Sequence, residues 1–328
     1  MMREITFSQA TLEAMQEEMR RDDTVFVYGE DIARQGGIFG QFAGLPDEFG
    51  AERVLDTPIS ETSIVGTGLG AALTGTRPVA DMHFADFIGI SGDELVNQIA
   101  KNRYMFGGQA NIPLVVRAPD GIINSAAAQH SQSVEAWFYN VPGLIVVTPS
   151  DAETAKGLLK SSIRLDDPVI YFENKVLYRQ KGPVPEEEYF TPIGKARVVR
   201  EGTDCTVCTY SIMVGKSIQA AEELEKEEGI SVEVVDLLTL KPMDVETIAA
   251  SIKKTHHAVV AHEAPVTGGV GAEIASRIQK EAFYYLDAPI ERVGAYDVPI
   301  PFSPVLQEFV APNPEKVKKA VKAALHMA

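Results

Sequence analysis

Glu61 is a carboxylate at the start of a stretch made almost entirely of small and apolar residues. Residues 55–70 read Leu-Asp-Thr-Pro-Ile-Ser-Glu-Thr-Ser-Ile-Val-Gly-Thr-Gly-Leu-Gly. Ser60 is a typical helix N-cap, and the helix dipole favours an acid in the first turn. Glu61 is therefore either a structural first-turn acid or an acid in a dry cleft whose proton takes part in chemistry. The glycines that follow would let a ligand or another chain approach the helix closely.

His130 is the histidine whose surroundings best suit catalysis. It lies in Asn-Ser-Ala-Ala-Ala-Gln-His-Ser-Gln at residues 124–132, a small and polar stretch that predicts a loop after a strand. Histidine can exchange a proton near neutral pH, which suits general acid–base work; a role in buttressing the loop is the alternative. His83 and His262 fall in predicted strands, and we expect them in the core. No histidine spacing typical of a metal site is present.

Cys205 and Cys208 have the C-x-x-C spacing of redox and zinc sites. They fall in a predicted strand, where residues i and i+3 point to opposite faces, so we interpret them as buried structural thiols. The run from Glu263 to Glu273 is rich in glycine but lacks the third glycine of a dinucleotide fingerprint, and its turn is too long. We expect it to pack at an interface rather than to bind a nicotinamide.

The charge balance argues against a nucleic-acid-binding protein. The 328 residues include 30 basic and 46 acidic side chains, a net charge of −16, with no visible basic patch. No apolar run is long enough to span a membrane. The first residues, Met-Met-Arg-Glu-Ile-Thr, lack the apolar segment of a signal peptide. We expect a cytoplasmic protein that binds neither nucleic acid nor membrane.

Strands and helices alternate along the chain, which indicates an α/β fold of two parallel-sheet domains. The first half predicts strands at 24–29, 77–84, 112–117, 144–149 and 168–173, and helices at 8–21, 88–106 and 151–165, with Ser8 and Asp151 as N-caps. The second half predicts strands at 206–210, 232–237, 258–262 and 290–294, and helices at 214–228, 245–255, 271–282 and 315–325. Because parallel strands end at one edge of a sheet, Glu30 and the loop at 121–132 should lie at that edge.

A linker is predicted between the two halves. Residues 179–192 hold three prolines, a glycine and three successive acids. We expect a first domain at residues 1–180, a linker at 181–194 and a second domain at 195–328.

A set of motifs in a fixed order then identifies a family resemblance. The motifs are Gly29-Glu-Asp31, Asp56-Thr-Pro-Ile-Ser-Glu61, Gly75-Thr-Arg-Pro-Val79, Phe84-Ala-Asp-Phe87, Arg103-Tyr-Met-Phe-Gly-Gly108, Ala127-Ala-Gln-His-Ser-Gln132, Ala155-Lys-Gly-Leu158 and Pro299-Ile-Pro-Phe302. Over essentially its whole length the chain resembles the β subunit of the thiamine-diphosphate-dependent dehydrogenase component of 2-oxo acid and acetoin dehydrogenase complexes. The resemblance implies a pyrimidine-binding α/β domain followed by a transketolase-type C-terminal domain.

The resemblance also implies roles for three side chains. Glu61 matches the acid that hydrogen-bonds the aminopyrimidine ring of the cofactor, where a protonated carboxyl favours the tautomer that removes the thiazolium proton. Phe87 matches the residue that packs against the pyrimidine face. His130 matches the histidine that serves acyl transfer to lipoamide.

Members of the family often hold a potassium ion on backbone carbonyls, which are hard ligands that suit such a cation. The matching positions in this chain are Leu114, Ser162, Ile163, Leu165 and Asp167.

One absent motif predicts a partner. The chain has no Gly-Asp-Gly, the motif with which thiamine enzymes hold the diphosphate and magnesium. The resemblance therefore implies that an α subunit supplies the magnesium and the diphosphate half of a shared site. It also implies an α2β2 heterotetramer that docks on a lipoyl-bearing acyltransferase core.

Departures from the family pattern leave alternatives open. Thr62-Ser-Ile64 and Ile90-Ser-Gly-Asp-Glu94 differ from the common residues beside the cofactor cleft, so substrate preference is open. The loop Gly36–Gly40 favours the pyruvate and acetoin members, whereas His262-Glu-Ala-Pro-Val-Thr-Gly-Gly269 leaves a branched-chain 2-oxo acid dehydrogenase β subunit possible. A non-catalytic interaction subunit and a stand-alone nicotinamide or redox protein are the alternatives from other classes.

Overall fold

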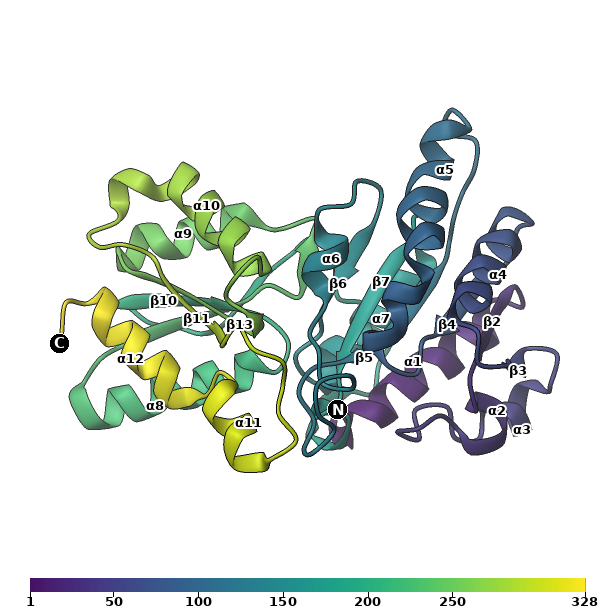
Figure 1. Cartoon of the computed structure of the whole chain (residues 1–328), viewed down its shortest axis with the longest axis horizontal. Helices are drawn as coiled ribbons and strands as arrows, with labels where there is room; N and C mark the ends of the chain where they lie inside the picture. The colour runs from purple at the N-terminus through teal and green to yellow at the C-terminus, as the bar shows by residue number, and fades with distance from the viewer. Residues whose placement is uncertain (328) are drawn as a thin grey trace. The chain divides into compact units, whose positions relative to one another are not determined.

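The computed structural model describes residues 1–327 and divides into two compact units. Unit 1 consists of Met1–Asp120 and Trp137–Ile193, and unit 2 of Gly121–Ala136 and the chain from Gly194 onward (Figure 1). Each unit is built on a sheet that carries helices, so the predicted α/β class is confirmed. Within the described residues no helix is long and apolar enough to cross a membrane.

The sheet of unit 1 is parallel, as the sequence pattern predicts. Its strands lie in the order β6-β7-β5-β4-β2-β3, and each neighbouring pair runs in the same direction. The bounds are β2 Val25–Gly29, β3 Val54–Asp56, β4 Arg77–Asp81, β5 Val115–Asp120, β6 Ile145–Val147 and β7 Val169–Asn174. All residues of β5 and β7 are buried, as expected for central strands covered on both faces.

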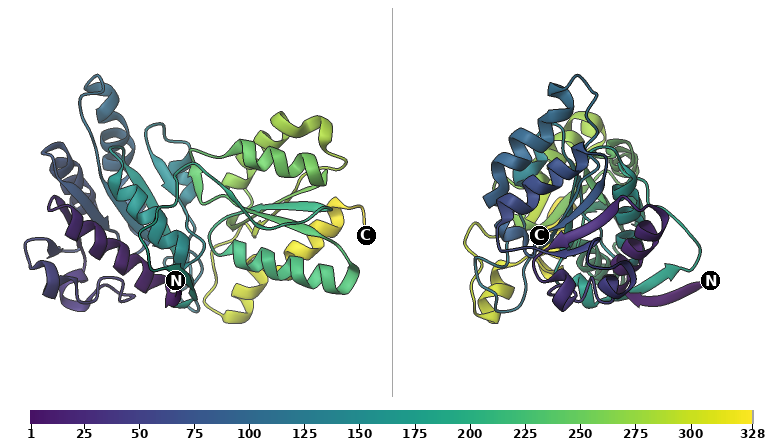
Figure 2. Two further views of the ribbon diagram at one scale, coloured as in Figure 1. Left: turned by 180° about the vertical axis from the view of Figure 1, so that it is seen from behind. Right: turned by 90° about the vertical axis from the view of Figure 1, so that its right-hand side faces the viewer.

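Two long helices of unit 1, α1 (Phe7–Arg21) and α7 (Ala152–Arg164), pack side by side (Figure 2). The buried ammonium groups of Lys156 and Lys160 on α7 each lie 2.6 Å from the carboxylate of Glu17 on α1. These lysines reach the helix interface because their long aliphatic stems pack against apolar surface while the charged ends find an acid.

The N-caps of these helices only partly follow the sequence. Asp151 caps α7 as predicted, with its side chain accepting the N–H of Thr154 at 2.8 Å. The prediction of Ser8 as the cap of α1 was wrong. Thr6 caps the helix instead, because its hydroxyl accepts the N–H of Gln9 and the Gln9 side chain accepts the N–H of Thr6.

The single helix predicted at 88–106 is broken into three segments. A 3₁₀ segment spans Ala85–Ser91, a π-type segment spans Glu94–Ile99, and α5 spans Ala100–Met105. Gly89 and Gly92 lie at the first break, where glycine weakens a helix. A Cβ on Gly89 would also lie 3.2 Å from the Trp137 ring, which is closer than such contacts normally are.

Several short elements lie where the sequence predicts only loop or linker. In the glycine-rich stretch after β2 the chain forms α2 (Ile32–Gln35) and α3 (Leu45–Phe49). Within the predicted linker, β8 (Lys181–Pro185) pairs antiparallel with β1 (Met2–Thr6). Further short elements are α6 Glu135–Tyr139, β12 Thr239–Lys241 and the 3₁₀ turns Leu177–Arg179 and Phe283–Tyr285.

The sheet of unit 2 has the order β14-β13-β10-β11-β9. Its strands are parallel except for the edge strand β9, which pairs antiparallel with β11 and was not predicted. The strands are β9 Arg197–Arg200, β10 Cys205–Thr209, β11 Val232–Asp236, β13 Ala258–Pro265 and β14 Glu291–Ala295. The helices, with α9 and α10 on one face and α8 and α12 on the other (Figure 1), are α8 Met213–Glu228, α9 Val245–Thr255, α10 Val270–Ala282, α11 Pro304–Val310 and α12 Pro314–Ala324.

Cys205, Cys208 and His262 are buried in the core of unit 2, as predicted. Burial raises the pKa of the Cys208 thiol to about 12, which leaves it unreactive at neutral pH. The ring of His262 occupies the space beside Gly269 and Gly271, so that a Cβ on Gly269 would lie 2.6 Å from the ring. Two glycines of the 263–273 run are therefore required by packing within unit 2.

The helix that begins at Glu61, α4 (Glu61–Leu73), uses its glycines in two ways. Gly68 packs against the core of unit 1, where Tyr28 donates its hydroxyl to the carbonyl of Ile64 at 2.7 Å. A Cβ on Gly68 would overlap the Tyr28 hydroxyl and lie 2.8 Å from a methyl of Leu114. Gly70 has open space beside it. The expectation that these glycines admit a ligand or another chain is therefore wrong for Gly68.

We predict that Gly68→Ala destabilises unit 1 by about 1–3 kcal/mol, because the new methyl group overpacks a filled site. Gly70→Ala, on the same helix with open space beside it, should change the free energy of unfolding by less than about 1 kcal/mol. Urea unfolding followed by circular dichroism measures both. Equal effects of the two substitutions would contradict the packing argument.

Candidate active site

Glu61 is the first residue of α4 and is half-buried. Ser60 occupies the N-cap position, as predicted, but its side chain makes no capping hydrogen bond; its hydroxyl donates to the hydroxyl of Ser63 at 3.0 Å. Among residues 1–327 no side chain or backbone group donates a hydrogen bond to the Glu61 carboxylate, and no basic side chain pairs with it. The carboxylate is therefore available to a group from outside the chain.

Two further carboxylates lie near Glu61 at the end of the unit 1 sheet. Glu30 directly follows β2, and Asp81 is the last residue of β4. Burial raises the pKa of Glu30, and the charges of Glu61 and Asp81 raise it further, against an opposite effect from His83. The Glu30 carboxyl therefore keeps its proton to a higher pH than an exposed glutamate does.

Asp81 is the most perturbed of these acids. It is 1% exposed, and burial raises its pKa to about 6, although the charge of Arg117 acts in the opposite direction. One of its oxygens accepts the backbone N–H of His83 at 3.0 Å, and the other has no hydrogen-bond partner among the described residues.

Behind Asp81 lies a fully buried ion pair. The guanidinium of Arg117 on β5 donates to both oxygens of Glu173 on β7, at 2.8 and 2.9 Å, and neither side chain is exposed. The ring of Phe42 covers the guanidinium with 4.7 Å between the group and the ring centre. A bidentate pair of this kind neutralises two charges that would otherwise be costly to bury.

His83 was predicted in a strand and in the core, and the structure corrects both points. It follows the end of β4, is half-buried, and has a left-handed backbone with φ of 60°. Its Nδ1 atom is buried and has no partner within residues 1–327. The backbone N–H of His83 donates to Asp81, and this hydrogen bond stabilises a left-handed conformation that residues other than glycine rarely adopt.

The turn at His83 leads into the aromatic residues Phe84 and Phe87. Their rings meet edge to face with centres 6.1 Å apart, and Phe87 lies half-buried in the 3₁₀ segment. The Thr62 hydroxyl of α4 donates to the carbonyl of Ile90 at 3.2 Å, which ties this segment to the helix of Glu61. Unit 1 therefore brings the Glu61 helix and the Phe87 segment together.

His130 belongs to the other unit. It is half-buried in residues 121–136, which group with unit 2 although they follow β5 in the chain. The structure thus assigns Glu61 and Phe87 to unit 1 and His130 to unit 2.

The proposed potassium ligands Ser162, Ile163, Leu165 and Asp167 lie around the C-terminal end of α7, and Leu114 directly precedes β5. Arg77 donates to the carbonyls of Ile163 and Leu165 at 3.1 and 2.9 Å. A carbonyl oxygen has two lone pairs, so these oxygens retain acceptor capacity. Within the described residues no group of three or more His, Cys, Asp or Glu side chains could hold a metal ion.

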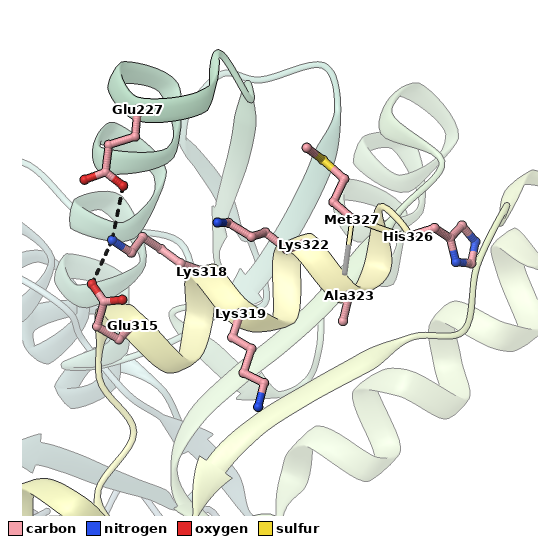
Figure 3. A pocket seen from close by; sticks show the side chains of 8 residues that line it. All are labelled: Glu227, Glu315, Lys318, Lys319, Lys322, Ala323, His326 and Met327. Atoms are coloured by element: carbon pink, nitrogen blue, oxygen red, sulfur yellow. Dashed lines mark hydrogen bonds and ion pairs between the residues drawn. The ribbon is translucent and has the colours of Figure 1, made fainter.

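A cavity of about 710 Å³ lies elsewhere, in unit 2. It is lined by Glu227, Glu315, Lys318, Lys319, Lys322, Ala323, His326 and Met327 (Figure 3). Lys318 pairs with Glu227 at 3.5 Å and with Glu315 at 2.7 Å. None of the predicted site residues lines this cavity.

Comparisons with known proteins account for both halves of the chain. Residues 3–181 match the transketolase pyrimidine-binding domain, and residues 194–317 match the transketolase C-terminal domain. The 2-oxoisovalerate dehydrogenase subunit beta of Bacillus subtilis is 48% identical over 311 residues, covering 94% of this chain and 95% of that protein. The pyruvate dehydrogenase E1 component subunit beta of Rickettsia felis is 46% identical over 319 residues, covering 97% and 98%. The chain belongs to this transketolase-like family of dehydrogenase β subunits.

A solved structure from the wider fold agrees with this family. It is titled a split gene transketolase, inactive beta4 tetramer, and matches 98% of this chain and 99% of its own with a TM-score of 0.78 and 26% identity. The family fold therefore extends over both units of the chain.

The sequence predicts Glu61, Phe87 and His130 as site residues of such a β subunit, and the structure adds two carboxylates near Glu61 that were not predicted to belong to the site. Glu30 was placed at the correct sheet edge without a role, and Asp81 was passed over as part of a strand. Both acids share a sequence signal: each lies at, or directly after, the last residue of a strand, and the two strands, β2 and β4, are parallel neighbours in the sheet.

Asp81 makes the stability of unit 1 depend on pH. Its folded pKa of about 6 lies above the ordinary 3.8, so the folded state holds the proton more tightly than the unfolded state. The protonated Asp81 carboxyl therefore stabilises the folded state below the ordinary pKa. This stabilisation is lost as the pH rises through the folded pKa, and the free energy of unfolding falls by up to about 3 kcal/mol.

We predict that Asp81→Asn removes this pH dependence. The stability difference between the variant and the wild type should change between pH 4 and pH 7 in favour of the variant, as measured by urea unfolding at each pH. Asp47→Asn, at an exposed position, is the control and should leave the dependence as it is. A parallel pair of curves for wild type and Asp81→Asn would rule out titration of Asp81 in this range.

Proposed function

We propose that the chain is the β-type half of a thiamine-diphosphate-dependent dehydrogenase component that cleaves pyruvate or acetoin and passes the acyl group to lipoamide. The observation that carries the proposal is the Glu61 carboxylate at the start of α4, to which no group among residues 1–327 donates a hydrogen bond. The near-complete alignment with the pyruvate dehydrogenase E1 β subunit of Rickettsia felis supports it.

The residues at the unit 1 sheet edge fit the pyrimidine half of the cofactor. When bound, thiamine diphosphate supplies a carbon nucleophile for the substrate carbonyl. Glu61, at the start of α4, would hydrogen-bond a ring nitrogen. Phe87, already ordered by its edge-to-face contact with Phe84, would pack against the ring.

A second chain must supply the rest of the site. The sequence has no Gly-Asp-Gly motif for the diphosphate and magnesium, so we place both on an α-type partner in an α2β2 assembly that docks on a lipoyl acyltransferase core. The related split gene transketolase structure is titled as an inactive tetramer of its beta chain, which supports the need for a partner. We also propose a cytoplasmic location.

We further propose a potassium ion at the carbonyls of Leu114, Ser162, Ile163, Leu165 and Asp167. The ion would share two of these oxygens with the Arg77 guanidinium. Its role would be to hold the turn between α7 and β7 rather than to act in the chemistry.

A branched-chain 2-oxo acid is the second candidate substrate. The 48% identity with the 2-oxoisovalerate dehydrogenase subunit beta of Bacillus subtilis favours it. Thr62, Ser63 and Ile90 are exposed beside the Glu61 helix, where they could shape a substrate pocket with the partner chain. Assays with pyruvate, acetoin and 2-oxoisovalerate distinguish the candidates.

We predict that this chain, combined with its α-type partner and thiamine diphosphate, reduces lipoamide, and that Glu61→Gln lowers the rate by roughly 10²–10⁴. The amide cannot transfer the proton, so exchange of the thiazolium C2 proton should slow in parallel when followed by NMR. Glu52→Gln, at an exposed position, is the control. Full activity of the partner alone, or unchanged exchange in Glu61→Gln, would contradict the proposal. If the wild-type chain forms a normally folded tetramer with its partner that does not reduce lipoamide, a non-catalytic subunit is favoured instead.

We predict that His130→Ala slows acyl transfer to lipoamide by roughly 10²-fold or more but leaves decarboxylation within a few-fold of wild type. The reason is that a positioned imidazole is needed only when the dithiolane sulfur takes up a proton. Lipoamide reduction measures the first rate, and reduction of an artificial electron acceptor measures the second. Equal losses in both assays would contradict a role of His130 that is confined to acyl transfer.

A further inference from the structure

The segment that carries His130 is a closed loop. The N–H of Gly121 donates to the carbonyl of Gln132 at 2.9 Å, so the two ends of residues 121–132 meet. Compact loops of this length with adjoining ends are frequently functional. Two of its residues other than glycine, Ser125 and Ala127, have left-handed backbones with φ of 56° and 57°. Such conformations persist only where surrounding contacts hold them.

Gln307 on α11 holds the strained part of this loop. Its side chain is 6% exposed, and both ends of its amide are used. The oxygen accepts the N–H of Ser125 at 3.1 Å, and the nitrogen donates to the carbonyl of Ile123 at 3.1 Å. Gln307 therefore binds the backbone at Ile123 and at the left-handed residue Ser125, five positions before His130.

Glu263, near the end of β13, holds both ends of the same loop. One of its oxygens accepts the N–H of Ile122 at 3.0 Å and the hydroxyl of Ser133 at 3.4 Å. The other oxygen lies 3.8 Å from the ammonium of Lys216. Because the carboxylate is 7% exposed, these contacts form in a largely dry environment and are correspondingly strong.

A buried hydrogen bond also fixes the chain directly after the loop. Tyr210 on the strand-to-α8 turn donates its hydroxyl to Glu135 at 2.6 Å, just after the loop. The Tyr210 ring in turn stacks on His262 of β13, with 6.2 Å between ring centres. The contacts described here thus anchor the loop to β13, to α11 and to the end of β10.

We propose that Gln307 and Glu263 are positioning residues that fix the His130 loop on unit 2, and that acyl transfer therefore depends on them. This inference rests on the proposed role of His130. Neither residue touches the reacting atoms. They act by holding the imidazole where the proton is needed, and displacement of a catalytic group by about 1 Å can cost roughly 10²-fold in rate.

Gln307→Met tests the proposal in the reconstituted complex. Methionine keeps the length and the apolar packing but removes both hydrogen bonds. Backbone hydrogen exchange at residues 122–127 should become faster by at least about tenfold, since the Ser125 N–H loses its acceptor. Lipoamide reduction should fall by roughly 10–10²-fold while reduction of an artificial acceptor stays within about twofold. Glu308→Gln, the exposed neighbour on α11, should change none of these rates.

Two further variants keep the proposal testable if Gln307→Met fails to fold. Gln307→Glu retains an acceptor for the Ser125 N–H but turns a carboxylate oxygen toward the carbonyl of Ile123, so it too should speed exchange at residues 122–127. Glu263→Gln should loosen the loop ends in the exchange experiment. In a His130→Ala background, Gln307→Met should cause no additional loss of acyl transfer, because residues that act as a unit are not additive.

The outcomes separate this inference from the proposed function. Unchanged exchange at residues 122–127 in both Gln307→Met and Glu263→Gln overturns the anchoring. Faster exchange with unchanged acyl transfer overturns the dependence of acyl transfer on the anchor. If His130→Ala itself leaves acyl transfer unchanged, the proposed role of His130 fails instead, and the coupling inferred here fails with it.

Discussion

The ion pair between Arg117 and Glu173 is the buried interaction behind the sheet edge where Asp81 and the helix of Glu61 lie. Both side chains are fully buried between β5 and β7, so each charge is tolerated only because the other is present. The guanidinium also acts on Asp81, whose carboxylate holds the His83 turn. That turn places the Phe84 and Phe87 pair, and Thr62 then ties the aromatic segment to the helix of Glu61. A chain of contacts thus runs from the buried pair to the helix of Glu61.

Unit 2 uses neutral and singly charged groups for a similar purpose. Gln307 and Glu263 bind backbone groups of the His130 loop, and a loop with two left-handed residues needs such contacts to keep one conformation. The two units therefore share a principle. In each, a buried polar side chain on a neighbouring element accepts hydrogen bonds from an irregular stretch of backbone.

Local signals in the sequence predicted regular elements well where the fold did not compete with them. α9 has the predicted bounds, Val245–Thr255, because an N-capping Asp244 and a periodic apolar face agree. The helix predicted at 88–106 is instead three segments, and Gly89 and Gly92, which weaken a helix, lie in and directly after the first of them. Ser8 is not the cap of α1, because Thr6 and Gln9 form a capping box two residues earlier. Ser60 is the N-cap residue of α4, but its hydroxyl bonds to Ser63 instead of to a backbone N–H.

The sequence by itself determined the alternation of strands and helices and the burial of the two cysteines, because these follow from residue type and short-range spacing. Its ordered family motifs also predicted Glu61, Phe87 and His130 as site residues. Only the tertiary structure decided that Glu30 and Asp81 join Glu61, that His83 leaves its strand, and that the His130 loop is held by Gln307 and Glu263. The physical reason is that burial, pKa and long-range hydrogen bonds depend on which elements come together. Glu263 and Ile122 are distant in sequence, yet a carboxylate oxygen of Glu263 lies 3.0 Å from the backbone nitrogen of Ile122, and no local pattern could have indicated that contact.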